Sequence, residues 1–211
     1  MTNKKYSQLG QDHWVLKHVN KTDGIFIDIG AHDGIELSNT YLLEQMGWTG
    51  ICVEPNRKSY QKLKNNRNCI LDDRAVYSKS GITLKFSENI DPTMSGLTPY
   101  GLQEVLTISL NDLCEQNNIS QIDYISLDVE GAELEILQAF NFNKYKVKCW
   151  TIEHNLYSNG NLQNFGSIMQ ILLGHNYLVK SHDWDFFAVL DDIEPEFYMN
   201  YEPINKEKNN G

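Results

Sequence analysis

The stretch Gly24-Ile-Phe-Ile-Asp-Ile-Gly-Ala-His-Asp-Gly34 decides the fold class of this chain. Its first half is a short run of β-branched and aromatic residues that ends in an acid, a pattern typical of a buried strand. Its second half holds glycines at positions 30 and 34, which predict a tight turn between the strand and a following helix. A buried strand that turns directly into a helix is typical of an α/β protein with a parallel sheet.

The rest of the chain repeats this alternation of short apolar runs and helical patterns. Strands are predicted at 24–28, 50–54, 82–86, 124–129 and 147–152, with a further strand around 69–71 and 75–77 and a closing hairpin at 177–180 and 186–190. Helices are predicted at 35–46, 55–66, 109–117, from about 130 onward, and at 165–173. The alternation predicts a mostly parallel sheet with helices on both faces. Ligands of such sheets bind at the carboxyl ends of the strands, so functional residues are expected there.

The composition limits the classes of function. The 211 residues include 18 Lys and Arg against 28 Asp and Glu, a formal net charge of −10. This balance argues against a protein that binds nucleic-acid phosphates or anionic lipids, which needs a surplus of cations. The length fits one domain, which we place at 1–204, with residues 1–22 covering the pocket and a flexible tail at 205–211.

The N-terminal residues and the cysteines predict the compartment. No signal-peptide pattern is visible, and no window approaches the ~20 apolar residues of a membrane span. The four cysteines lack the spacing of a zinc site or a C-x-x-C pair, and three of them lie in apolar runs, as buried reduced thiols do. We therefore expect a cytoplasmic protein with no membrane span.

The turn after the first predicted strand favours an adenosyl ligand without phosphates. His32 stands where the second glycine of the dinucleotide fingerprint G-x-G-x-x-G would be, and Asp33 would repel a pyrophosphate. S-adenosylmethionine (SAM) carries a sulfonium and an ammonium group, which both suit nearby carboxylates. Glu54 ends the second strand, where an acid accepts hydrogen bonds from the ribose hydroxyls of NAD or SAM alike. Asp73, after the third strand, is placed to accept the adenine amino group.

Further acids and one histidine follow the next two predicted parallel strands. Neighbouring strand ends lie ~5 Å apart, so Asp128, Glu153 and His154 converge on one pocket if these strands are adjacent. His154 is then the expected base for a hydroxyl proton, oriented by the two acids. The alternative is that the same three residues hold Mg²⁺ or Mn²⁺, which acidifies the hydroxyl directly. A base without metal is the preferred interpretation.

These motifs resemble those of the FkbM-type SAM-dependent methyltransferases. The matching stretches are Ser7-Gln-Leu-Gly-Gln-Asp12, Phe26 to Gly34, Ser38-Asn-Thr40, Val53-Glu-Pro55, Ala75-Val76 with Gly81, Ile108-Ser-Leu-Asn-Asp112 and Asp123-Tyr-Ile-Ser-Leu-Asp-Val-Glu-Gly-Ala-Glu-Leu-Glu-Ile-Leu137. The last is the most specific, and together they cover roughly residues 6 to 155. One departure is Ser126, because the family often has a lysine two residues before the matching acid.

The resemblance implies a class I methyltransferase fold, which is Rossmann-like, with a seven-stranded, mostly parallel sheet, an antiparallel last strand and helices on both faces. It also implies SAM-dependent O-methylation of a sugar, a glycan or another small natural product. The cofactor residues implied by matching positions are Gln8, Asp28, Gly30, Ala31, His32, Gly34, Glu54, Pro55, Asp73, Ala75 and Asp128. The expected acceptor-facing residues are Ser38, Asn39, Ser95 within the loop 93–96, Glu130 and Asn155.

Two functions from other classes remain open at this point. A nicotinamide oxidoreductase would share the acid at Glu54 but would have a glycine in place of His32. A non-catalytic adenosyl-binding protein would need Asp28 and Glu54 but none of the acids that follow the later strands. The expected partner under the preferred interpretation is a small-molecule or glycan acceptor, with no nucleic acid. The oligomeric state is not predicted.

Overall fold

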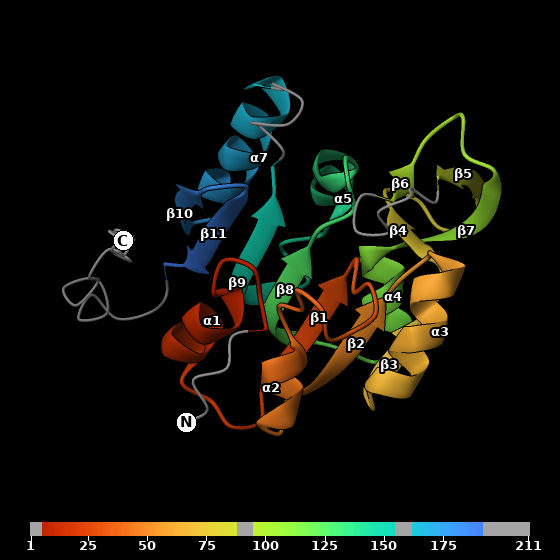
Figure 1. Ribbon diagram of the computed structural model, residues 1–211. Helices are drawn as coiled ribbons and strands as arrows, with labels where there is room; N and C mark the ends of the chain where they lie inside the picture. The colour runs from red at the N-terminus through yellow and green to blue at the C-terminus, as the bar shows by residue number, and fades with distance from the viewer. Residues whose placement is uncertain (1–5, 88–94, 155–161, 192–211) are drawn as a thin grey trace, which may run out of the picture.

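The chain folds around a central sheet that contains the stretch Gly24 to Gly34. The computed structural model describes residues 6–87, 95–154 and 162–191. Strand β1 (Ile25–Ile29) lies inside a seven-stranded sheet of order β10-β11-β9-β8-β1-β2-β3 (Figure 1). The other strands are β2 (Thr49–Val53), β3 (Ile70–Asp72), β8 (Gln121–Leu127), β9 (Lys146–Glu153), β10 (Tyr177–His182) and β11 (Asp185–Leu190). Only β11, the last strand in the described residues, runs antiparallel to its neighbours, so the predicted sheet is confirmed.

Helices cover both faces of this sheet, as predicted. One face packs against α1 (Gln11–Val19), α2 (Tyr41–Gln45) and α3 (Arg57–Asn66), and the other against α4 (Leu110–Gln116), α5 (Glu133–Ala139) and α7 (Leu162–Gly174). Side chains alternate along β1. Phe26 packs into the apolar cluster beneath α1, α2 and α3, whereas Ile27 and Ile29 pack into the cluster beneath α4, α5 and α7. Both faces of β1 are therefore buried, which explains why every residue of the strand except Asp28 is apolar.

A second, smaller sheet lies beside the main one and was only partly foreseen. It has the order β4-β7-β5-β6, with β4 (Ala75–Tyr77), β5 (Thr83–Ser87), β6 (Gly96–Leu97) and β7 (Gln103–Ser109). The sequence predicted strands near β4 and β5 but not β7. The last three residues of β7 are all buried, so the strand lacks a regular alternation of exposed and buried residues. Phe86 of β5 is buried and belongs to a cluster with Ala75 and Val105.

The helix predicted at 35–46 is wrong in its first half, because only Tyr41–Gln45 is helical. The carboxylate of Asp33 accepts hydrogen bonds from the backbone N–H groups of Ile35 and Glu36, and Leu37 has a left-handed φ of 55°. The hydroxyl of Ser38 then accepts the N–H of Tyr41 at 3.0 Å. Side chains thus satisfy the backbone locally and hold 35–40 as a loop.

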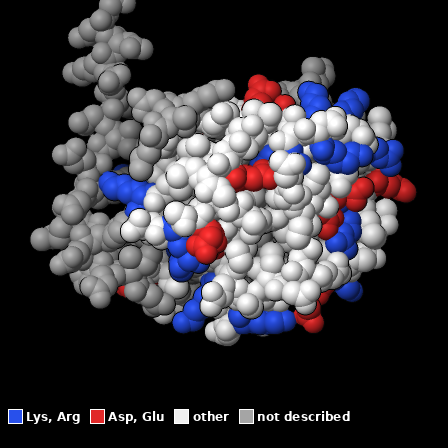
Figure 2. Space-filling view, turned by 90° about the horizontal axis from the view of Figure 1, so that it is seen from below, with Lys and Arg blue, Asp and Glu red and all other residues white. Residues whose placement is uncertain are grey.

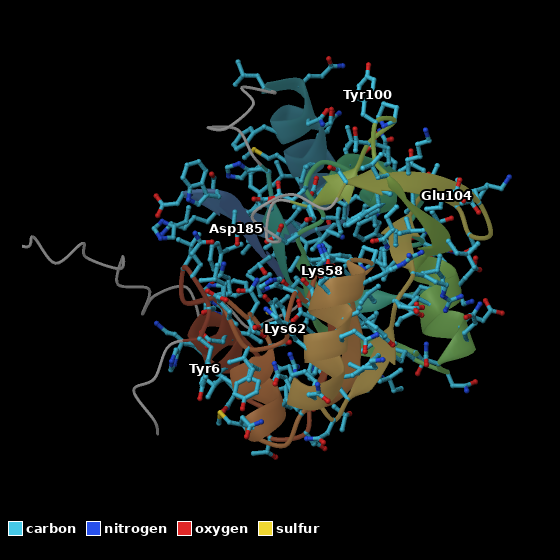
Figure 3. All side chains as sticks on the ribbon, turned by 45° about the vertical axis from the view of Figure 1, so that its right-hand side comes forward. Tyr6, Lys58, Lys62, Tyr100, Glu104 and Asp185 are labelled. Atoms are coloured by element: carbon cyan, nitrogen blue, oxygen red, sulfur yellow. The ribbon has the colours of Figure 1, made fainter. Side chains whose placement is uncertain are left out.

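One buried cation ties the helices of the first face to the turn after β1. The guanidinium of Arg67, at the end of α3, contacts the Glu44 carboxylate of α2, donates to Thr40 Oγ1 at 3.0 Å and to the carbonyl of Gly34 at 3.3 Å, and lies 4.0 Å from Asp28. By contrast, Lys58 and Lys62 on the same helix are exposed (Figure 3). Arg67 therefore belongs to the interior, although the composition of α3 is that of a surface helix.

We expect Arg67→Met to lower the free energy of unfolding by about 3–5 kcal/mol, because it leaves the buried Asp28 carboxylate and the half-buried Glu44 carboxylate without their cation. Urea denaturation followed by circular dichroism measures the change. Lys62→Met is the matched control, and as an exposed substitution it should change stability by less than about 0.5 kcal/mol. Equal stabilities for the two variants would contradict the structural role of Arg67.

Acidic and basic side chains mix on the face at the amino ends of the parallel strands (Figure 2). There Asp123 accepts the N–H of Ile25 and pairs with Lys21 at 3.1 Å and Lys148 at 3.0 Å. The four cysteines are free thiols. Among the described helices, none combines the length and apolar character that crossing a membrane requires.

Candidate active site

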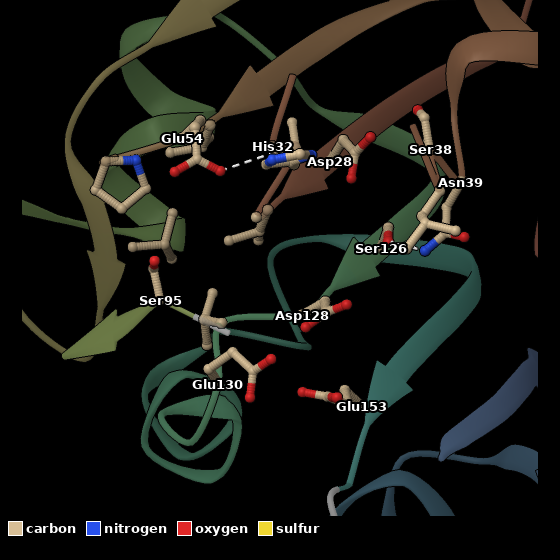
Figure 4. Close-up of a pocket in the computed structure, with 18 of the residues that line it drawn as sticks. Asp28, His32, Ser38, Asn39, Glu54, Ser95, Ser126, Asp128, Glu130 and Glu153 are labelled. Carbon is tan, nitrogen blue, oxygen red and sulfur yellow. Dashed lines mark hydrogen bonds between the residues drawn. The ribbon is translucent and has the colours of Figure 1, made fainter. Parts of the chain in front are cut away.

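A cavity of about 410 Å³ opens at the carboxyl ends of β1, β2, β8 and β9, within the ~300–1,000 Å³ range of ligand sites (Figure 4). The loops after these strands, the N-terminal segment and the small sheet form its walls. The structure brings together there most of the residues named from the sequence: Gln8, Asp28, Gly30, Ala31, His32, Ser38, Asn39, Glu54, Pro55, Ala75, Ser95, Asp128, Glu130 and Glu153. Their individual roles stay predictions.

The turn after β1 requires a glycine at its start. Gly30 has a φ of 90°, and a Cβ on it would lie 1.8 Å from the carbonyl oxygen of Asp128. The backbone N–H groups of Gly30 and Ala31 both donate to the carbonyl of Val53 at 3.0 Å. This close approach sets the turn directly against the end of β8, so the two strand ends form one continuous floor.

Glu54, at the end of β2, faces the cavity with both oxygens anchored. Oε2 accepts the N–H of His32 at 2.8 Å, and Oε1 accepts the N–H of Asn56 at 2.7 Å. Burial raises the pKa of Glu54 to about 7, although these two N–H donors act in the opposite direction. Each carboxylate oxygen keeps a second lone pair, so Glu54 can still accept hydrogen bonds from a diol such as ribose.

The residues around this end of the cavity suit SAM. Both ring nitrogens of His32 and the amide oxygen of Asn39 are buried and find no hydrogen-bond partner among the described residues. Asp28 is buried, accepts the Thr40 hydroxyl at 2.5 Å and has a pKa that burial raises. A ligand with ribose hydroxyls and an ammonium group would supply donors and charge for these oxygens. Glu54 would hold the ribose, and Asp28, His32 and Asn39 would lie toward the amino-acid end.

A group of carboxyls occupies the other end of the cavity. Oxygens of Asp128, Glu130 and Glu153 lie within 4.8 Å of one another, and Figure 4 shows the side chains of Glu130 and Glu153 pointing toward each other. Carboxyl groups this close disfavour the charged form of each other, so the pair takes up a proton more readily than isolated acids do. Burial and the neighbouring acids raise the pKa of Glu153 to about 8. The pKa of Asp128, whose side chain is exposed to the cavity, is raised well above its usual range by desolvation and by the carboxylates of Glu153, Asp185 and Glu130.

His154 does not join this group, which corrects the prediction that it converges with Asp128 and Glu153. Its Nε2 lies 3.1 Å from the hydroxyl of Ser181, and its ring packs edge-on against Phe165 and Phe186. Successive residues of a strand point in opposite directions, so once Glu153 faces the cavity, His154 cannot. Glu130 takes the place expected for the histidine. Burial also lowers the pKa of His154.

Two other expected site residues lie elsewhere. Asp73 is exposed and does not line the cavity, because the neighbouring Asp72 turns back to bind Arg74. Gly34 also lies outside the lining: a Cβ on it would lie 2.6 Å from Leu63 of α3, so this glycine serves packing. Asn155 and residues 93 and 94 of the loop 93–96 lie outside the described residues, as does the tail 205–211.

Sequence reasoning missed several lining residues, among them Gln11, Ser126, Trp184 and Asp185. Asp185 begins β11 and pairs with Glu153, the last residue of β9, because the two strands are antiparallel. Its carboxylate accepts a hydrogen bond from Gln11 at 2.8 Å, and burial raises its pKa to about 6. The predicted hairpin could have indicated Asp185. An antiparallel last strand places its first residue beside the last residue of the strand that it pairs with, which here is Glu153.

We expect the preference for SAM over S-adenosylhomocysteine to rise by about fivefold or more between pH 6 and pH 8.5. The raised pKa values of Glu54, Glu153 and Asp185 mean that the cavity gains negative charge across this range, and only SAM carries a sulfonium. Calorimetric titrations of both compounds at matched pH values measure the ratio of dissociation constants. A ratio that stays constant, or that falls with pH, would contradict these ionisations.

Comparisons with known proteins agree with this geometry. The family model described as the methyltransferase FkbM domain matches residues 28–179. Among solved structures, the precorrin-6y C5,15-methyltransferase from Geobacter metallireducens GS-15 is 14% identical, with a TM-score of 0.50 over 90% of this chain and 94% of that chain, which shows the fold alone. TrmK from M. capricolum, in complex with S-adenosyl-homocysteine, is 17% identical, with a TM-score of 0.43 over 92% and 75% of the two chains. A putative rRNA methylase from Clostridium thermocellum is 10% identical, with a TM-score of 0.48 over 89% and 96%. A comparison with curated protein sequences finds no significant match.

Proposed function

The chain belongs to the methyltransferase FkbM domain family and is a SAM-dependent methyltransferase. We propose that it methylates a hydroxyl oxygen of a sugar, a glycan or another small natural product. The observation that carries the oxygen acceptor is the Asp128–Glu153 pair. A hydroxyl is a weak nucleophile and needs a base to take its proton, whereas an amine in its neutral form needs none. The pair places a proton acceptor at the end of the cavity opposite Glu54.

SAM supplies an electrophilic methyl group when it is bound. Bound SAM would give this methyl group to the acceptor oxygen and leave as S-adenosylhomocysteine, and the Glu153 carboxylate takes the hydroxyl proton. Asp128 holds the proton that it shares with Glu153 and so fixes the orientation of the base. The floor formed by Gly30 and Asp128 aligns the two reactants, and alignment supplies much of the rate in such a displacement.

The raised pKa of Glu153 suits its proposed role as a general base. A base is most effective when its pKa lies near the working pH, and burial together with nearby acids brings Glu153 to about 8. The two carboxyls titrate as a unit, so the pair accepts one proton. Activity should therefore rise with pH through this range, as the pair loses its extra proton.

We expect Glu153→Gln to lower kcat by about 10²- to 10⁴-fold while leaving the dissociation constant for SAM within threefold, because it removes the base and not the cofactor contacts. Steady-state kinetics and calorimetry separate the two effects. Glu135→Gln, an exposed acid on α5, is the matched control and should keep the original kcat. If His154→Gln lost as much activity as Glu153→Gln while binding SAM normally, the assignment of the base would be wrong.

Asp128, Glu130 and Glu153 are also the residues that would hold a divalent metal, since carboxylate oxygens suit Mg²⁺ and Mn²⁺. The mechanism above requires no metal. Turnover should therefore stay within twofold after dialysis against a chelator and should not respond to added Mg²⁺ or Mn²⁺. A loss of turnover that either ion restores would assign the carboxylates to a metal instead.

A further inference from the structure

The charge of the cavity wall narrows the class of acceptor. Seven acids line the cavity, namely Asp28, Glu36, Glu54, Asp128, Glu130, Glu153 and Asp185, and the described lining contains no Lys or Arg. A phosphate or carboxylate on the acceptor would thus meet carboxyl groups at the ends of several strands and no cation among the described lining residues.

The acids are not spread evenly between the two ends. Glu130, Glu153 and Asp185, together with Asp128, lie beyond the turn that suits SAM. Asp185 lies beside Glu153, because the first residue of β11 pairs with the last residue of β9. The region left for the acceptor is therefore lined by four acids and, among the described lining residues, by no Lys or Arg.

One aromatic side chain completes this region. Trp184 lines the cavity with 40% of its surface exposed, and it lies in the tight turn between β10 and β11, directly before Asp185. Its carbonyl accepts the N–H of His154 at 2.8 Å, so the backbone of the turn is fixed to the end of β9. An indole face beside carboxylates is a surface that takes both the apolar face of a ring and a cation.

Resting on the proposed function, we propose that the acceptor is a hydroxylated ring that carries a protonated amine, and no phosphate or carboxylate, near the hydroxyl that is methylated. An amino sugar is the simplest compound of this class. Glu130 and Asp185 hold the ammonium group and keep it protonated, so its nitrogen has no lone pair for the methyl group. The Asp128–Glu153 pair is left for the hydroxyl proton, and Trp184 packs against the ring.

The test is a binding panel on the full chain saturated with S-adenosylhomocysteine and kept in a chelator. The probes are methyl glycosides of glucosamine, N-acetylglucosamine, glucose and glucuronic acid, with glucose 1-phosphate, each titrated at pH 7.5. The amine should bind at least tenfold more tightly than its N-acetylated or neutral match, and the two anions should not bind. Equal affinity for the amine and its neutral matches, tighter binding of an anion, or no binding by any probe overturns the proposal.

Substitutions test which residues carry the preference. Glu130→Gln should reduce the preference for the amine over glucose at least fivefold without weakening glucose itself, whereas Glu135→Gln should leave the preference unchanged. Trp184→Ala should weaken all bound rings alike, and Trp184→Phe should restore them. Binding that Mg²⁺ strengthens for the neutral glycosides would assign the acids to a metal and overturn the proposal.

Methyl transfer to the bound probes tests the proposed function separately from the acceptor class. An O-methyl product with the amino sugar supports both. A product methylated on nitrogen contradicts the oxygen acceptor but not the binding preference. Faster O-methylation of glucose or glucose 1-phosphate contradicts the acceptor class alone.

Discussion

The structure depends on holding several carboxyl groups at one edge of a buried sheet. The carboxyl ends of β1, β2, β8 and β9 bring Asp28, Glu54, Asp128 and Glu153 to a single cavity. Burial and the neighbouring carboxylates disfavour their charged forms and raise their pKa values. A fold gains nothing in stability from such an arrangement. It becomes favourable when a cationic ligand enters, which is the property of a SAM-binding site.

The fold accommodates these acids because different local interactions stabilise each of them. Backbone N–H groups anchor Glu54, the Thr40 hydroxyl and the Arg67 guanidinium stabilise Asp28, and Asp128 and Glu153 lie close enough that each favours the protonated form of the other. The N–H groups of Val129 and Gly131 likewise bind the buried Glu133 and hold the loop that carries Glu130. Arg67 thus supports the end of the cavity near Asp28 without lining the cavity, whereas the described lining near Glu153 contains no Lys or Arg. This difference separates the two halves of the site.

The parts of the site that the sequence predicted are those fixed by short-range geometry. Gly30, Glu54 and Asp128 each end a strand or begin a turn, and a single pattern of apolar residues locates them. The predictions that were wrong or missing depend on how strands distant in the sequence pair with one another. Whether Glu153 or His154 faces the cavity depends on the residue at which β9 ends, and Asp185 enters the site only through its pairing with β9. The hydrogen bonds of Asp33 and Ser38 overruled the helical pattern at 35–40.

Calorimetric titration of the purified chain with SAM, S-adenosylhomocysteine and NAD tests the central claim most directly. The account predicts one site per chain that binds both SAM and S-adenosylhomocysteine, and no detectable heat with NAD, because Asp33 and the acids of the cavity repel a pyrophosphate. Saturable NAD binding with no response to SAM would contradict the assignment of this cavity to SAM, and with it the mechanism built on Asp128 and Glu153.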